Sequence, residues 1–192
     1  MAATACAGRW NCRTAISSWA LADIPAYRRI YVIRSRDRGE SWGPPVTVAD
    51  VPGKEFEEPA PLLLPDGRIV MLLRENRSRR LHLVRSDDGG RTWSAPAPTA
   101  IDGYPAHLLR LQDGRMLCTV GYRQPPYGIR AVLSEDGIDF DASGAVAIRD
   151  DLSNRDLGYP CTLQAGDGSL VTIYYAQDRD GVTAIMSSRY SL

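Results

Sequence analysis

A carboxylate and a guanidinium flank a predicted hairpin in the first half of the chain, where they could move a proton and bind an anion. Glu58 stands before one apolar run, Arg74 ends the next, and the turn Asp66-Gly67 separates the two runs. Asp-Gly between short apolar runs is a strong hairpin signal. Opposed residues of a hairpin centred on this turn have numbers that sum to about 133, so Glu58 is expected beside Arg74. A carboxylate can act as a base and a guanidinium binds carboxylates, so this pair is the first candidate for chemistry.

An X-Pro pair opens each of three predicted hairpins, 8 or 9 residues before the Asp-Gly turn. The pairs are Glu58-Pro59, Tyr104-Pro105 and Tyr159-Pro160, and the turns begin at Asp66, Asp113 and Asp167. Since proline has no N–H for a ladder, each pair is expected at the start of a strand. Glu58 and Tyr159 have the same offset from their turns, so both are expected at the same end of a repeated unit.

An eight-residue box, Ser-x-Asp-x-Gly-x-Ser/Thr-Trp, recurs in phase with these hairpins. Its copies begin at residues 35, 86 and 134, and the third is one residue shorter and has Phe in place of Trp. Short polar side chains can bond to backbone amides within a turn, glycine supplies positive φ, and the aromatic ring covers apolar surface. The boxes are therefore predicted to be structural. Their residues are Ser35, Asp37, Gly39, Trp42, Ser86, Asp88, Gly90, Trp93, Ser134, Asp136 and Phe140.

These repeats predict an all-β fold. The box starts are 51 and 48 residues apart, and a period near 50 residues with four strands is typical of a propeller blade. We expect an irregular segment at residues 1–26 and repeated units at about 27–56, 57–101, 102–155 and 156–192. Propellers close with about four to eight blades, so about 3–3.5 units predict a partial β-propeller.

Composition excludes several other classes of protein. Lys+Arg and Asp+Glu both number 23, so no overall charge favours nucleic acid, and no apolar run is long enough to span a membrane. The four cysteines lack the spacing of a metal or dithiol site, and no cofactor is predicted. Cys118 and Cys161 are expected to be buried thiols, and Cys6 and Cys12 could form a disulfide. The N-terminus resembles a signal peptide only weakly, so no compartment is predicted.

Residues 29–192 resemble the Asp-box (BNR) repeats of the sialidase superfamily, whose fold is a six-bladed β-propeller. The segment from Glu58 to Arg74 is similar to the sialidase segment that holds a glutamate and an arginine. Gly158-Tyr159, followed by Asp167-Gly168, resembles the late segment that carries the tyrosine nucleophile. The resemblance places this chain in the C-terminal part of such a propeller.

The resemblance also implies site residues and an activity. Tyr159 would be the nucleophile, Glu58 the base that activates it, and Arg74 an arginine that binds the substrate carboxylate. Arg123 is the first choice for a further arginine and Arg130 the second, with Tyr104 expected beside Arg123 in the hairpin register. The implied activity is that of an exo-α-sialidase acting on a sialoside. The family's general acid and first arginine have no match upstream of Arg29, so weak or no activity is expected from this chain alone.

Other interpretations remain open from the sequence. The chain could be a non-catalytic BNR module that binds carbohydrate or protein, or a glycoside hydrolase that acts on a neutral sugar. Glu58 and Arg74 could be only a cross-strand ion pair, and Tyr159 could simply pack at a strand start. Strand alternation predicts that Glu57 points away from Glu58. His107 is expected to be structural, and exposed edge strands favour self-association.

Overall fold

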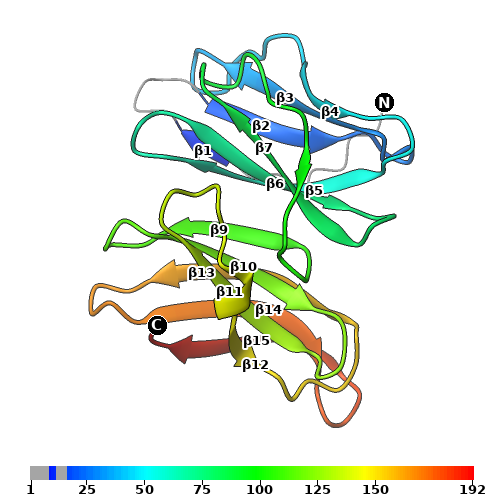
Figure 1. Ribbon diagram of the computed structural model, residues 1–192, viewed down its shortest axis with the longest axis vertical. Helices are drawn as coiled ribbons and strands as arrows, with labels where there is room; N and C mark the ends of the chain where they lie inside the picture. The colour runs from blue at the N-terminus through cyan, green and yellow to red at the C-terminus, as the bar shows by residue number, and fades with distance from the viewer. Residues whose placement is uncertain (1–8, 12–16) are drawn as a thin grey trace. The chain divides into compact units, whose positions relative to one another are not determined.

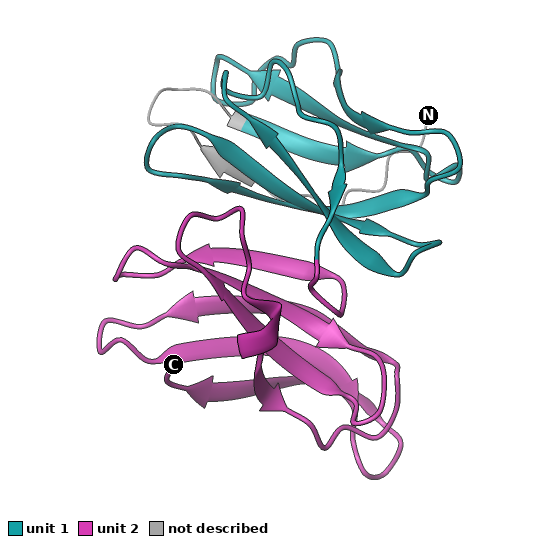
Figure 2. Ribbon diagram, in the orientation of Figure 1, with its two compact units in different colours: residues 1–99 teal, residues 100–192 magenta. Residues whose placement is uncertain are grey.

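The computed structural model describes residues 9–11 and 17–192, and the chain divides into two compact units, residues 1–99 and 100–192 (Figure 1; Figure 2). Each unit contains two antiparallel sheets in which strands adjacent in sequence are also adjacent in space. Three of the sheets in the described residues have four strands, and the last has three.

Unit 1 holds the first two sheets. The strands of the first sheet are β1 (Arg9–Asn11), β2 (Ser17–Ala22), β3 (Arg29–Ser35) and β4 (Val46–Asp50). The strands of the second sheet are β5 (Phe56–Leu63), β6 (Ile69–Glu75), β7 (Arg80–Ser86) and β8 (Ala97–Pro98). The predicted turn at Asp66-Gly67 joins β5 to β6.

Unit 2 holds the third and fourth sheets. The third contains β9 (Ala106–Arg110), β10 (Met116–Tyr122), β11 (Gly128–Ser134) and β12 (Val146–Arg149), with the 3-10 helix η1 (Ala142–Gly144) before β12. The fourth contains β13 (Leu157–Gln164), β14 (Leu170–Gln177) and β15 (Thr183–Tyr190).

The expectation of an irregular segment at residues 1–26 is wrong where the structure describes that segment. β1 and β2 lie within it, and β2 pairs with β3 along its length, from Ser17 opposite Ser35 to Ala22 opposite Ile30. The buried side chains of β2 are Ser18, Ala20 and Ala22. These small side chains carry little of the β-branched and aromatic signal by which a strand is recognised in sequence.

Apolar side chains from alternate strand positions form the core of each unit. In unit 1, Ile30 and Val32 pack in one cluster with Phe56, Ile69 and Met71. The first five residues of β6 are all buried, as expected for a strand covered on both faces. In unit 2, one cluster joins Ile129, Leu157 and Tyr174 and links the third sheet to the fourth.

The cysteines divide between core and surface. Cys118 is buried in β10, and burial raises the pKa of its thiol. The prediction that Cys161 is buried is wrong, because this residue occupies an outward-facing position of β13 and is exposed. Cys6 and Cys12 lie outside the described residues. Among the residues that the structure describes, no helix is long and apolar enough to cross a membrane.

Candidate functional site

Hydrogen bonds fold each Asp box into a turn. In the second box, Ser86 donates to Asp88 (2.8 Å) and accepts from the Gly90 amide (2.8 Å), while Asp88 accepts from the amide and hydroxyl of Thr92 (2.9 and 2.7 Å). The first and third boxes form the same kind of turn around Asp37 and Asp136. These bonds occupy the polar groups of the boxes within the turns, so the boxes offer little chemistry to a substrate.

Glu58 sits in a bulge at the start of β5. The ladder pairs Glu57 with Arg74 and then Ala60 with Leu72, which leaves Glu58 and Pro59 in the bulge. Glu58 has φ of 50°, in the left-handed region. For a residue with a side chain this conformation costs about 1–2 kcal/mol, and a following proline restricts the backbone further. Such outliers persist where the surrounding structure imposes them, and they are concentrated at functional sites.

Arg74 binds two carboxylates rather than the one predicted. Its Nη1 lies 3.0 Å from Glu58 Oε2, and its Nε lies 3.2 Å from Glu57 Oε1. The Glu58 side chain is only 8% exposed. The prediction that Glu57 points to the other face is wrong, because the bulge shifts the pairing by one residue and interrupts strict alternation. The bulge therefore gathers two acidic side chains around one guanidinium.

Tyr159 occupies the matching position in unit 2. The β13–β14 ladder shifts register between Gly158 and Cys161, and Tyr159 has φ of 50°, the same as Glu58. Its side chain is 47% exposed, while Gly158 and Pro160 on either side are buried. The two residues that the sequence singled out at equal offsets thus share one unusual backbone conformation.

Arg123 packs close to this bulge within unit 2. Its guanidinium carbon lies 5.5 Å from the centre of the Tyr104 ring. A Cβ placed on Gly158 would lie 3.4 Å from Arg123 Nη2, so the guanidinium reaches the residue before Tyr159. The predicted register of Arg123 opposite Tyr104 is off by one, since β10 ends at Tyr122 and the Tyr104 amide donates to the carbonyl of Gly121 (2.9 Å).

Tyr175 and Asp156 join this group, and sequence reasoning missed both. The Tyr175 ring lies 5.9 Å from that of Tyr159, and its hydroxyl donates to Asp156 Oδ1 (2.7 Å). Burial and the bond to Asp156 raise the pKa of Tyr175, although the positive charge of Arg123 opposes the rise. One signal could have found Tyr175, because it follows Tyr159 by 16 residues, as Arg74 follows Glu58.

Arg130 stands apart from this group in its contacts. Its guanidinium carbon lies 3.3 Å from the centre of the Tyr122 ring, a cation–π contact within the β10–β11 hairpin. Arg123, and not Arg130, is the arginine that packs on Tyr104 and lies near Gly158 in unit 2.

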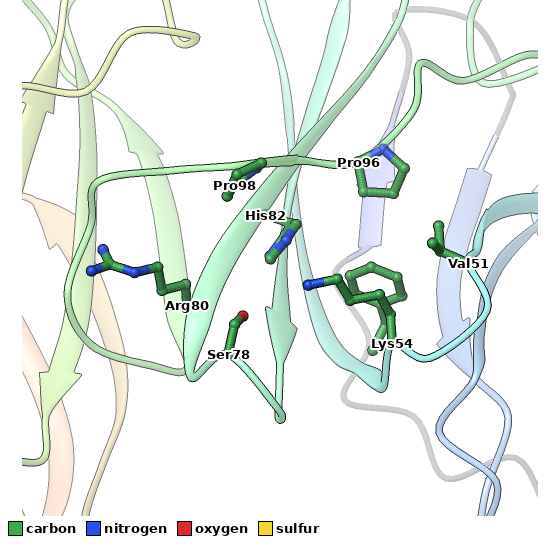
Figure 3. Close-up of a pocket in the computed structure, with 8 residues that line it drawn as sticks. Val51, Lys54, Ser78, Arg80, His82, Pro96 and Pro98 are labelled. Carbon is green, nitrogen blue, oxygen red and sulfur yellow. The ribbon is translucent and has the colours of Figure 1, made fainter.

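The two histidines have different surroundings. His107 accepts from the Thr162 amide at Nδ1 (3.3 Å), which ties β9 to β13. His82 lines a hollow of about 220 Å³ in unit 1 with Phe56 and Lys54 (Figure 3). Burial lowers the pKa of His82, and its Nδ1 has no hydrogen-bond partner among the described residues. No group of metal-ligating side chains occurs in the described residues.

A second buried carboxylate, Glu75, lies at the same end of the second sheet as Glu58. It accepts from the amides of Glu55 (3.1 Å), Arg77 (3.1 Å) and Ser78 (2.8 Å), and it lies 3.3 Å from Lys54 Nζ. Burial alone would raise the pKa of Glu75, but hydrogen bonds from Ser78, Glu55 and Arg77 outweigh it and lower the pKa to about 2. In its charged form, Glu75 thus fixes the loop before β5 and the loop after β6, on either side of the Glu58 hairpin.

Glu75→Gln is expected to reduce the loss of unfolding free energy as the pH falls. Because the folded pKa lies below the unfolded value of 4.5, the stabilisation is present above pH 4.5 and is lost as pH falls toward 2. The wild type should lose about 3 kcal/mol of unfolding free energy through this group between pH 6 and 2, measured by urea denaturation. The exposed Glu40→Gln is the control and should keep the wild-type slope. Equal slopes in wild type and Glu75→Gln would contradict the assignment.

Tyr159→Gly is expected to be more stable than Tyr159→Ala. Alanine keeps the cost of positive φ and glycine removes it, so the glycine variant should gain about 1 kcal/mol of unfolding free energy over alanine. Cys161 is an exposed position in the regular ladder, so there the alanine variant should be more stable than the glycine variant by about 0.5–1 kcal/mol. If alanine were the more stable at both positions, the backbone strain at Tyr159 would be refuted.

Comparisons with known proteins identify the fold and the family. A structure of a protein of unknown function from Dyadobacter fermentans is 29% identical, with a TM-score of 0.85 over 94% of this chain and 51% of its own. This chain thus spans about half the length of that protein. The Hadza microbial sialidase Hz136 is 18% identical, with a TM-score of 0.67 over 95% of this chain and 43% of its own. An endo-arabinase from Bacteroides thetaiotaomicron is 14% identical, with a TM-score of 0.70 over 96% of this chain and 74% of its own.

At these low identities the sialidase and the arabinase show only a shared fold. Together with the four sheets, they confirm the predicted all-β, partial-propeller class, which is shared with glycoside hydrolases. Curated protein sequences give no match. A family model described as a BNR repeat-like domain matches residues 54–173. Since these residues make up more than half of the chain, the protein belongs to the BNR repeat-like family.

Proposed function

We propose that the protein is a sialidase-like glycoside hydrolase, with Tyr159 as its nucleophile and Glu58 as the base that accepts the phenolic proton. The observation that carries this proposal is the shared bulge. Glu58 and Tyr159 both hold a costly left-handed backbone before a proline, at equivalent places in their sheets. A purely structural residue at either place would be replaced by glycine at lower cost, so a role for the side chain is the better explanation.

Each of the two proposed residues has an arginine near it within its own unit, which suits a substrate that carries a carboxylate beside its anomeric carbon. Arg74 contacts Glu58, and Arg123 reaches Gly158 next to Tyr159. Planar guanidinium groups bind carboxylates through paired hydrogen bonds. The substrate carboxylate would repel an ionised nucleophile, and a neutral tyrosine avoids this repulsion; sialidases are the known exception to the usual carboxylate nucleophile.

In the proposed reaction the Tyr159 oxygen bonds to the anomeric carbon as the glycosidic C–O bond breaks. The phenolic proton passes to Glu58, and water then hydrolyses the tyrosyl-glycosyl intermediate. The general acid that protonates the leaving group is not assigned to any residue, and a general acid is commonly worth about 10²–10⁴ in rate. We therefore expect slow turnover of ordinary sialosides by the chain as it stands.

A fluorinated sialosyl fluoride tests the nucleophile directly, because fluoride leaves without protonation. Intact-mass analysis should show one added glycosyl group, and peptide mapping should place it on Tyr159. Glu58→Gln should slow the labelling, and the ester of the same sugar, which lacks the carboxylate charge, should label more slowly still.

Two other outcomes would overturn the proposal. Absence of labelling, with sialoside binding that survives Glu58→Gln, would support a non-catalytic BNR module. Labelling by neutral glycosyl fluorides in preference to the sialosyl compound would indicate a hydrolase for a neutral sugar, for which the arginines would be dispensable.

A further inference from the structure

Arg123 is held in unit 2 by contacts that leave its orientation incompletely fixed. Its guanidinium packs over the Tyr104 ring, which sets one face of the group but supplies no directed hydrogen bond. Its Nε is buried and has no hydrogen-bond partner among the described residues. Gly158 leaves the space that Nη2 occupies, because a Cβ there would lie only 3.4 Å away. A further contact is needed to direct the remaining N–H groups.

Tyr175 supplies that contact. Its hydroxyl lies close enough to Arg123 for the charge of the guanidinium to lower the Tyr175 pKa, and it donates to Asp156 Oδ1 at 2.7 Å. A phenolic hydroxyl has one proton, so once it donates to Asp156 only its lone pairs face the guanidinium, which can donate to them. Without Asp156 the hydroxyl proton could rotate toward Arg123 and oppose the contact. Asp156 therefore turns the lone pairs of the Tyr175 hydroxyl toward Arg123.

We propose that Asp156 and Tyr175 are positioning residues that orient the Arg123 guanidinium beside Tyr159 to receive a carboxylate. The inference rests on the proposed function for the identity of that carboxylate, but the positioning itself is a property of unit 2. Tyr175 packs against the Tyr159 ring and opposes Gly158 in the ladder, so one side chain contacts both the proposed nucleophile and the anion-binding group.

Binding measurements can separate positioning from simple structural support. The probes are a sialic acid analogue and its uncharged amide, titrated by calorimetry into the full chain. Tyr175→Phe and Asp156→Asn should each weaken the carboxylate about tenfold and the amide much less, because a hydrogen bond to a charged group is lost. Asp156→Glu should recover part of the difference. Equal weakening of both probes, or no weakening of either, would overturn the proposal.

Tyr174→Phe is the matched control. It removes the same hydroxyl from the neighbouring residue, whose side chain lies on the opposite face and bonds to Arg149 (3.0 Å) and Ser188 (2.9 Å). This variant should leave the ratio of the two affinities unchanged, even if it lowers thermal stability.

A second measurement needs no substrate. The Nε–H proton of Arg123, assigned by its loss in Arg123→Lys, should give a sharp nitrogen-correlated NMR signal in the wild type that broadens in Tyr175→Phe. If this signal responds while the carboxylate probe does not bind the wild type, the positioning holds and the proposed function fails. A signal that is unchanged in Tyr175→Phe would refute the positioning itself.

Discussion

Tyr159→Phe is expected to reduce sialoside turnover by at least about a thousandfold, because the ring has no oxygen left to attack the anomeric carbon. Phenylalanine keeps the size of the side chain and its packing against the Tyr175 ring, whose centre lies 5.9 Å away. It also keeps the left-handed backbone, since that conformation is set by the bulge. The fold should therefore be preserved, and the melting temperature should change by no more than a few degrees.

An activated aryl sialoside is the best substrate for this comparison, because its leaving group needs little protonation. Single-turnover rates at high protein concentration remove any dependence on slow release of product. Tyr31→Phe, a tyrosine of β3 in unit 1, controls for the loss of a hydroxyl elsewhere and should leave the rate unchanged. If Tyr159→Phe retained more than a tenth of the wild-type rate, Tyr159 could not be the nucleophile.

The hairpins and their ends could be predicted from sequence, whereas the detailed pairing at their mouths could not. Asp66-Gly67 correctly predicts that β5 and β6 pair and that Arg74 comes to Glu58. The bulge at Glu58 then adds one residue to a single strand, which brings Glu57 to the same guanidinium. Two-residue alternation contains no information about such an insertion. The X-Pro pairs Glu58-Pro59 and Tyr159-Pro160, which lie in the two bulges, are the signal that should have suggested one.

Residues that join the site from outside the hairpins are harder to predict. Asp156 precedes β13, and its hydrogen bond to Tyr175 spans 19 residues of sequence. Asp156 belongs to no repeated motif, so only the assembled structure shows that it meets Tyr175. The small side chains of β2 were missed for a different reason, since their burial depends on the neighbouring strands and not on their own hydrophobicity.

Arg74→Met is expected to cause the largest loss of stability, about 3–5 kcal/mol in the free energy of unfolding at pH 7. Methionine fills a similar volume, so the loss would come from charge and not from a cavity. The substitution leaves the carboxylates of Glu57 and Glu58 together without their cation, and Glu58 is only 8% exposed. Arg68→Met is the matched control, because it removes a more exposed ion pair with Asp66 (2.7 Å) from the same hairpin and should cost much less.

A further measurement attributes the loss to the uncompensated carboxylates. Adding Glu57→Gln and Glu58→Gln to Arg74→Met should recover most of the stability at pH 7, since an ion cluster replaced by neutral groups of similar shape is often nearly neutral in energy. A cost for Arg74→Met no greater than that for Arg68→Met would mean that solvent, and not Arg74, compensates these charges. In that case the guanidinium would not hold Glu58 in the bulge. The residues on either side of Glu58 would then have to impose its strained backbone conformation.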